Sequence, residues 1–139
     1  MKSEFIKKAY ANNEYTSEQI EELKICYRDP IYFMKKYVKV MHPKKGVVPF
    51  ELYPYQEEML RAFAGNRNNI VLSARQTGKT MVTVVYLLWF AIFNFDKTVL
   101  IVSNKNDNAK EIIYRAKFIL ERLPSWLKPG INDDGYNKH

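Results

Sequence analysis

The feature that most constrains the fold is a polar loop held between a short apolar run and a long apolar stretch. Ile70-Val71-Leu72 is typical of a buried strand. Residues 81–95 are apolar on nearly all sides, which predicts a buried helix. A second run of buried-strand type, residues 98–102, precedes a helical pattern over residues 109–123. This order predicts an α/β fold with a parallel sheet and right-handed connections.

The loop itself carries a phosphate-binding pattern. It ends in Gly78-Lys79-Thr80, as a P-loop does, although Ser73 stands where that pattern has its first glycine. Gly78 lets the backbone approach phosphate oxygens, Lys79 supplies an ammonium group to the β- and γ-phosphates, and Thr80 supplies a hydroxyl to Mg²⁺. A chance Gly-Lys-Thr is the alternative, which the position between strand and helix disfavours. The predicted ATP-binding residues of the loop are Ser73, Ala74, Arg75, Gln76, Thr77, Gly78, Lys79 and Thr80.

Three further side chains have expected roles at this loop. Arg75 is expected to act with Lys79 in catalysis by stabilising charge on the γ-phosphate. Its alternatives are an exposed or acid-paired arginine, or one more phosphate contact. The Gln56 amide can pair with the N6 and N7 positions of adenine, and a nearby tyrosine such as Tyr55 can stack on the ring. Taken alone, a Tyr-Gln pair usually has a structural role. Its position about twenty residues before the loop favours a role in adenine binding.

The chain divides into three parts on its local signals. Residues 1–50 form a helical lead-in, in which Thr16 and Asp29 are predicted helix caps, with Gln19 completing a capping box and Pro30 opening the second helix. Residues 42–54 are expected to be an irregular connector, and residues 56–64 a short helix. Residues 51–130 are the nucleotide-binding part, and residues 131–139 are irregular. The first helix either docks a partner or is a plain surface helix. We prefer the plain surface helix.

At the end of its second predicted strand, the sequence lacks the acidic residues that an ATPase needs. The second predicted strand ends in Val102-Ser103-Asn104, without the acidic residues that hold Mg²⁺ and activate water. Asp133 and Asp134 follow no buried strand and are expected to form a hydrophilic turn. His42, His139 and Cys26 lack the spacing of metal ligands. We therefore expect the front part of a longer ATPase, which binds nucleotide at best and is inactive alone.

The charge balance points to polyanionic partners. The chain has 22 basic and 15 acidic residues, a net charge of +7, and the excess lies mostly outside residues 51–103. A solvated basic surface and a surface facing nucleic acid remain alternatives. Cys26 is the one cysteine, so an intrachain disulfide is excluded and a reducing compartment is expected. No apolar run has the roughly 18 residues that span a bilayer, so no membrane is expected.

Several of these segments together resemble one protein family. From about Asp29 to Asn132 the chain is similar to the N-terminal ATPase region of the large terminase subunit of tailed bacteriophages, in the myovirus-like branch. The segments that carry the resemblance are residues 29–33, 45–50, 55–56, 73–80 and 121–131. In that family the loop typically starts without glycine and contains an arginine, so Ser73 and Arg75 support the match.

The resemblance implies a fold and a function. The fold would be a P-loop NTPase of the RecA or ASCE kind, here incomplete, and the parent protein would package viral DNA by hydrolysing ATP and cut it with a nuclease domain. Gln56 would bind adenine, Lys79 and Thr80 would hold phosphates and Mg²⁺, and Arg75 would assist at the γ-phosphate. Implied partners are double-stranded DNA, the portal protein, the small terminase subunit and further copies in a ring. The implied location is the cytoplasm of the infected bacterium and, transiently, the procapsid portal.

Two other functions fit part of the pattern. A DNA or RNA helicase can also carry a glutamine motif upstream of its P-loop. A basic DNA- or partner-binding module with a vestigial loop would need no nucleotide. Equal nucleotide affinity for the chain and its Lys79→Ala variant would favour the binding module.

Overall fold

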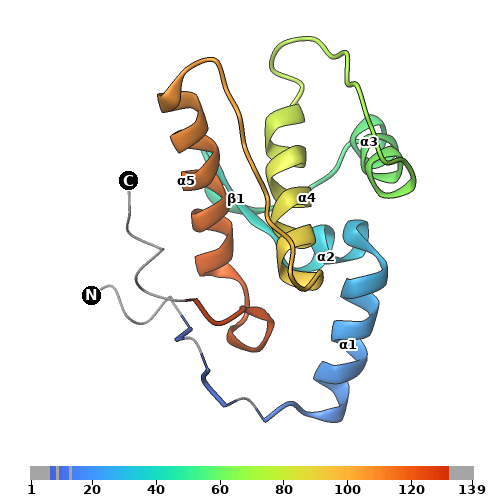
Figure 1. The fold of residues 1–139 in the computed structure, drawn as a ribbon, viewed down its shortest axis with the longest axis vertical. Helices are drawn as coiled ribbons and strands as arrows, with labels where there is room; N and C mark the ends of the chain where they lie inside the picture. The colour runs from blue at the N-terminus through green and yellow to red at the C-terminus, as the bar shows by residue number, and fades with distance from the viewer. Residues whose placement is uncertain (1–6, 9, 13, 132–139) are drawn as a thin grey trace.

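The structure is a computed structural model that describes residues 7–8, 10–12 and 14–131. These residues form helices α1 (Ser17–Arg28) and α2 (Pro30–Tyr37), strands β1 (Lys39–His42) and β2 (Gly46–Pro49), and helices α3 (Pro54–Gly65), α4 (Lys79–Phe93) and α5 (Asn106–Arg122). A 3₁₀ turn, Ser125–Leu127, follows α5. The described fold is therefore mostly helical, as Figure 1 shows.

The start of the fold confirms the predicted caps. Thr16 and Gln19 form a capping box at α1, in which each side chain accepts a hydrogen bond from the other residue's backbone N–H. The Asp29 carboxylate accepts hydrogen bonds from the backbone N–H groups of Ile31 and Tyr32, and Pro30 is the first residue of α2. Because these contacts lie within three residues of one another, local sequence was enough to predict both helix starts.

Residues 42–54 are not the irregular connector that we expected. β1 and β2 form an antiparallel hairpin in which His42 pairs with Gly46 across the intervening residues 43–45. Gly46 has φ +72°, the left-handed conformation that three-residue hairpin loops use. The His42 ring nitrogen Nδ1 accepts hydrogen bonds from the backbone N–H groups of Lys44 and Lys45. The turn residues in this stretch thus close a hairpin rather than an open loop.

The hydrophobic core lies where α2 and α4 meet α1, α3 and α5. Phe33 of α2 is fully buried and packs edge-on against Phe93 of α4, with ring centroids 5.6 Å apart. The Trp89 indole N–H donates a buried hydrogen bond of 2.7 Å to the backbone carbonyl of Cys26. Burial raises the pKa of the Cys26 thiol to about 12. The other buried apolar residues are Met34, Val38, Phe50, Leu60, Val82, Val84, Val85, Ile119, Leu123 and Leu127.

Two lysines of α2 tie this helix to its neighbours. Lys35 forms an ion pair with Glu57 of α3, and Lys36 with Glu22 of α1. Each lysine holds the pKa of its partner carboxyl below the usual value. Since both lysines are about half exposed, these pairs add little to the stability that the core supplies.

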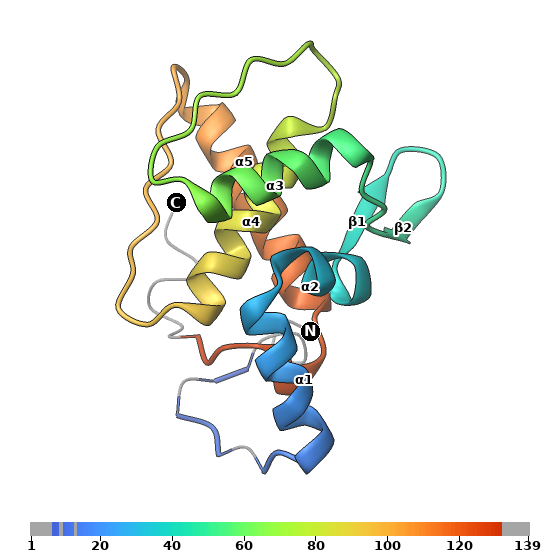
Figure 2. The same cartoon turned by 90° about the vertical axis from the view of Figure 1, so that its right-hand side faces the viewer.

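The predicted parallel sheet is wrong. β1 and β2 form the only sheet among the described residues, it is antiparallel, and residues 70–72 and 98–102 belong to no strand. Figures 1 and 2 show that α4 and α5 run side by side in the same direction, joined by an extended segment that returns along their outside. The two helices that flank residues 98–102 were predicted correctly, but the strands predicted at residues 70–72 and 98–102 are not formed, and neither is the P-loop NTPase sheet that they would build.

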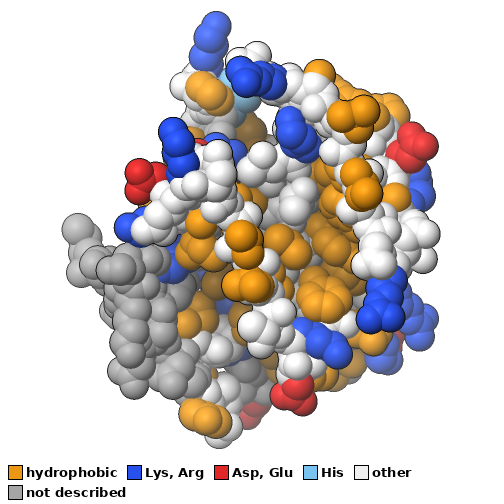
Figure 3. All heavy atoms as spheres, turned by 45° about the horizontal axis from the view of Figure 1, so that its top comes forward, with side chains coloured by type: hydrophobic (Ala, Val, Ile, Leu, Met, Phe, Trp, Pro, Cys, Tyr) orange, Lys and Arg blue, Asp and Glu red, His pale blue; other side chains and the backbone are white. Residues whose placement is uncertain are grey.

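The two apolar runs have exposed side chains and no neighbouring strand, and Figure 3 shows hydrophobic side chains at the surface of the molecule. The Ile70 and Leu72 side chains are 100% exposed, and Leu100 and Val102 are more than 80% exposed. Val99 and Ile101 alternate with them and turn inward, where they line a small cavity of about 140 Å³ with residues of α4 and α5. A strand needs a neighbour to satisfy its backbone hydrogen bonds. No described segment lies in pairing position, so both runs stay extended and unpaired.

No helix among the described residues is long and apolar enough to cross a membrane.

Candidate phosphate-binding loop

The loop lies between the extended residues 70–72 and the first turn of α4, beside the start of α3 (Figure 2). Two of its residues have left-handed backbone conformations, Gln76 with φ +63° and Gly78 with φ +74°. Gly78 is the cap residue of α4, and it directs the chain straight into the helix. A positive φ at glycine carries no steric penalty, which explains why this position of the pattern has no side chain.

Side chains from α3 hold the loop at the Thr77 carbonyl. The Tyr55 hydroxyl donates to this oxygen at 2.8 Å, and the Gln56 amide Nε2 donates to it at 3.1 Å. Gln56 is only 4% exposed, and its Oε1 atom also accepts a hydrogen bond from the Tyr53 backbone N–H at 3.0 Å. The structure therefore brings Tyr55 and Gln56 to the loop and gives both of them a structural contact there.

Gly78 permits this contact with α3. A Cβ atom at Gly78 would lie 2.7 Å from Gln56 Nε2, closer than nonbonded atoms approach. Any other residue would therefore meet two obstacles, the positive φ and the Gln56 amide. Gly78 therefore allows the loop to pack closely against α3.

Hydrogen bonds inside the loop fix its curvature. The hydroxyl groups of Ser73 and Thr77 lie 2.6 Å apart, and the Thr77 hydroxyl also donates to the Ala74 carbonyl at 3.1 Å. The Lys79 ammonium reaches back across the loop and donates to the same Ala74 carbonyl at 2.9 Å. Ser73 at the first position therefore takes part in closing the loop, a contact that a glycine could not make.

The N-terminus of α4 adds positive electrostatic potential to the loop. No side chain caps this helix, and no acidic residue lies in its first turn. Its first backbone N–H groups and the Lys79 ammonium are therefore donors without a neighbouring carboxylate of the helix. Thr80 is exposed at the second helical position. This donor set fits the phosphate chain of a nucleotide, and the Thr80 hydroxyl suits one coordination position of a Mg²⁺ ion that phosphate oxygens also bind.

A cavity of about 400 Å³ adjoins the loop on the side of α3. Lys79, Ser73 and Thr77 line it from the loop, and apolar side chains such as Met59 and Phe63 line it from α3. Tyr55 lines the cavity and stacks on Tyr53, with ring centroids 5.7 Å apart and planes 6° from parallel. The cavity thus has Lys79 at one end and apolar side chains along its α3 wall, with Glu58 also in its lining. A cation beside an apolar wall can take the phosphates and the base of a nucleotide.

The side chains of Arg75, Ala74 and Gln76 take no part in the hydrogen bonds described above. Arg75 is exposed and makes no hydrogen bond or ion pair with the part of the chain that the structure describes. Ala74 contributes its carbonyl oxygen, and Gln76 contributes its strained backbone. The guanidinium of Arg75 is free to reach a bound anion, but the structure assigns it no position against one.

Sequence reasoning missed two features of the site. One is the Thr77 carbonyl, which receives both donors from α3. The other is the second role of Gln56, which reaches back to the residue before α3. The signal for the latter was present, because a glutamine at the third helical position is the partner expected in a capping box. The contact to Thr77 spans 21 residues and has no local signature.

Metal-binding side chains do not gather elsewhere in the described ranges. No group of three or more His, Cys, Asp or Glu residues there is placed to hold a metal ion. The sequence also matches none of the known protein-family models.

Proposed function

We propose that the loop Ser73–Thr80 binds the phosphates of ATP, and that the chain is the ATP-binding portion of a DNA-packaging ATPase of the phage terminase kind. The observation that carries the proposal is the tie between α3 and the loop at the Thr77 carbonyl. It holds an arched backbone, a lysine and an uncapped helix start in one place before any ligand binds. Preorganised donors of this kind lose little entropy when an anion arrives.

Phosphate binding requires the Lys79 ammonium to change partner. In the structure it donates to the Ala74 carbonyl, a neutral acceptor. A phosphate oxygen is a charged acceptor and forms a stronger hydrogen bond with an ammonium group. Lys79 would therefore leave Ala74 for the phosphate, and the backbone N–H groups of the first turn of α4 would complete the site. Mg²⁺, when bound with Thr80 and phosphate oxygens, supplies charge neutralisation.

The contacts of Gln56 refine its proposed role. Its Oε1 atom and one Nε2 proton are already used by Tyr53 and Thr77, which leaves one amide proton for a base. A bidentate reading of adenine would require these contacts to break. We therefore propose that Gln56 positions the loop for any nucleotide and contributes at most one hydrogen bond to adenine.

The larger function is proposed on the resemblance of the sequence. Double-stranded DNA, the portal protein, the small terminase subunit and a ring of copies would be the partners of the motor, and the cytoplasm of the infected host its location. The net charge of +7 supports a polyanionic partner. The nucleotide step can be tested without any of them.

The test is the affinity of the full chain for a fluorescent ATP analogue, with and without Mg²⁺. We expect Lys79→Ala to weaken binding roughly 10- to 100-fold, because it removes a hydrogen bond between two charged groups. Lys97→Ala, which removes an exposed lysine from the turn after α4, is the matched control and should leave the affinity unchanged. Equal affinities for the unaltered chain and Lys79→Ala would refute phosphate binding at this loop.

A second variant separates the two roles of Gln56. If Gln56 mainly holds the loop, Gln56→Ala weakens ATP and GTP binding to the same extent. If it mainly reads adenine, the variant loses its preference for ATP while GTP affinity stays the same. Competition of unlabelled ATP and GTP against the fluorescent analogue distinguishes the two results.

A further inference from the structure

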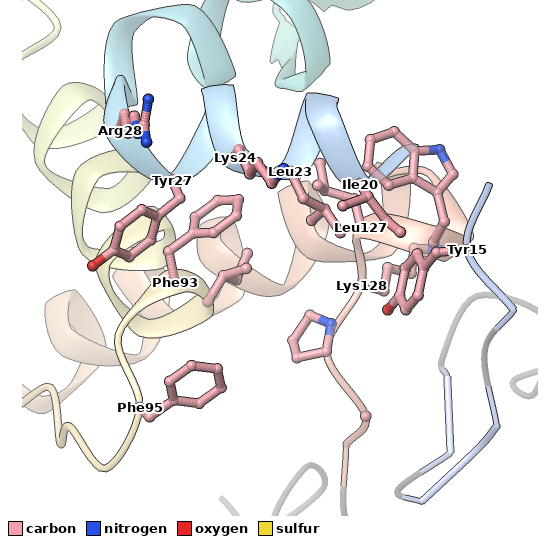
Figure 4. Close-up of a pocket in the computed structure, with 14 residues that line it drawn as sticks. Tyr15, Ile20, Leu23, Lys24, Tyr27, Arg28, Phe93, Phe95, Leu127 and Lys128 are labelled. Carbon is pink, nitrogen blue, oxygen red and sulfur yellow. The ribbon is translucent and has the colours of Figure 1, made fainter. Parts of the chain in front are cut away.

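A second hollow lies away from the loop, between α1, the end of α4 and residues 126–130. Its volume is about 750 Å³, and it shares no lining residue with the cavity beside the loop. Figure 4 shows Tyr27 and Phe95 toward one end of this hollow, and Tyr15, Ile20 and Leu127 toward the other. We call it the α1–α4 groove.

One face of α1 forms a wall of the groove and is only partly covered. Ile20, Leu23 and Tyr27 recur at helical spacing along this face, and all three line the groove. Ile20 is 44% exposed and Tyr27 is 56% exposed, whereas Cys26, on another side of the same helix, is fully buried. Phe95, just beyond α4, faces the groove from the opposite side and is 88% exposed. Helix α1 thus has a second apolar face that the described residues cover only in part.

The charges at the groove have one sign. Its lining includes three cationic side chains, Lys24, Arg28 and Lys128, and no carboxylate. Lys24 is paired with Glu21 at 2.6 Å, and Lys128 donates to the Glu121 carbonyl at 2.7 Å. Arg28 forms no hydrogen bond or ion pair with the described residues. A partner that brings a carboxylate to this edge would therefore meet an uncompensated guanidinium.

We propose that the α1–α4 groove binds an acidic amphipathic helix of a partner protein, whose apolar side chains fill the groove and whose carboxylates face Arg28 and Lys24. The stretch from Ile20 to Tyr27 corresponds to about two helical turns, so a short helix lying along α1 matches its length. Aromatic residues and an arginine at one concave surface are typical of sites where a partner helix anchors. This proposal is independent of nucleotide binding, because the two sites have no residue in common.

The mixture of residues favours a peptide over a nucleic acid. Apolar side chains make up most of the lining, and two of the three cations already have partners. A nucleic acid requires a continuous path of available cations along its phosphates. An acidic amphipathic helix requires an apolar trough with a cationic edge, which is what α1, Phe95 and Arg28 provide.

The probe is a set of labelled peptides of about 14 residues with Leu, Phe or Trp on one helical face and Glu on the rest. A second set keeps the apolar face and replaces every Glu by Lys. Binding to the full chain is followed by fluorescence anisotropy at low and high salt. We expect the Glu peptides to bind more tightly than the Lys peptides, and the difference to shrink at high salt.

Two groove variants and two matched controls locate the binding. Tyr27→Ala should weaken the best Glu peptide roughly tenfold, and Arg28→Glu roughly three- to tenfold. The controls are Tyr114→Ala and Lys110→Glu, which make an aromatic truncation and a charge reversal on exposed positions of α5 outside the groove. Both controls should bind like the unaltered chain. Circular dichroism of each variant would check that its helices are retained.

Four results would overturn the proposal. They are no measurable binding of any Glu peptide, equal binding of both sets, binding that neither groove variant weakens, and self-association of the chain that Tyr27→Ala abolishes. Vesicles of anionic phospholipid are a further arm. If they bind the chain through Tyr27 and Arg28 while the Glu peptides do not, the groove faces a membrane surface and the peptide proposal is wrong.

Discussion

Helix α4 and the extended segment 98–103 are both rich in apolar side chains, yet they are buried to very different extents. Val82 and Val85 of α4 are fully buried, whereas Leu100 and Val102 of the segment are more than 80% exposed. A helix satisfies its own backbone hydrogen bonds and needs only a surface to pack against. An extended segment needs a neighbouring strand as well. The comparison shows that an apolar run predicts burial only where the fold also supplies a partner for the backbone.

The most severe way to disturb the packed region is to remove its central ring. Phe33→Ala would leave a cavity against Phe93 and lower the free energy of unfolding by about 3–5 kcal/mol. Urea denaturation followed by circular dichroism measures the loss. Phe95→Ala, which truncates an 88% exposed ring just beyond the same helix, is the control and should change stability by less than about 0.5 kcal/mol. Similar losses for both would mean that the core is not where we place it.

A smaller effect is expected from the buried hydrogen bond between α4 and α1. Trp89→Phe keeps an aromatic ring but leaves the Cys26 carbonyl without its donor, which should cost about 1–3 kcal/mol of unfolding free energy. Thermal denaturation of the variant checks the value. Tyr114→Phe removes a hydroxyl from an exposed ring of α5 and should be neutral. Unchanged stability in Trp89→Phe would show that this bond does not help to hold α1 against the core.

The smallest effect is expected in the extended segment itself. Val102→Ala should change the free energy of unfolding by less than about 0.5 kcal/mol, because its side chain already meets water. Val85→Ala makes the same substitution at a fully buried site and should cost about 2 kcal/mol. The paired urea curves test the contrast between the two regions directly. A large loss at Val102 would show that another part of the protein covers this segment.

Features that depend on neighbouring residues were predictable from the sequence. Thr16 with Gln19, and Asp29 with Pro30, mark helix starts because their hydrogen bonds close within three residues. The hairpin at residues 39–49 is also a local structure, although the prolines and glycine of residues 42–54 predict an irregular connector. The sequence signal for the hairpin is the glycine at position 46 in a short turn, where the structure has a left-handed conformation.

Features that depend on distant pairing were not predictable in the same way. The sequence of residues 70–72 and 98–102 has the composition of strands, but pairing depends on which segments come together in space. The sequence pattern identified the loop and Gln56 as candidates for a nucleotide site, and that role stays a prediction. The hydrogen bonds of Tyr55 and Gln56 to the Thr77 carbonyl were not predicted, because no local pattern encodes a contact across more than 20 residues.

The buried thiol of Cys26 has a practical consequence. Cys26 is the one cysteine of the chain, it is fully shielded, and its raised pKa keeps it protonated at neutral pH. A thiol in that state reacts with a maleimide or disulfide reagent only when the surrounding helices open. The rate of labelling at Cys26 therefore reports the opening of the core directly. The labelling rate of this natural cysteine can therefore be compared with and without ATP or a helical peptide, and no label site has to be added.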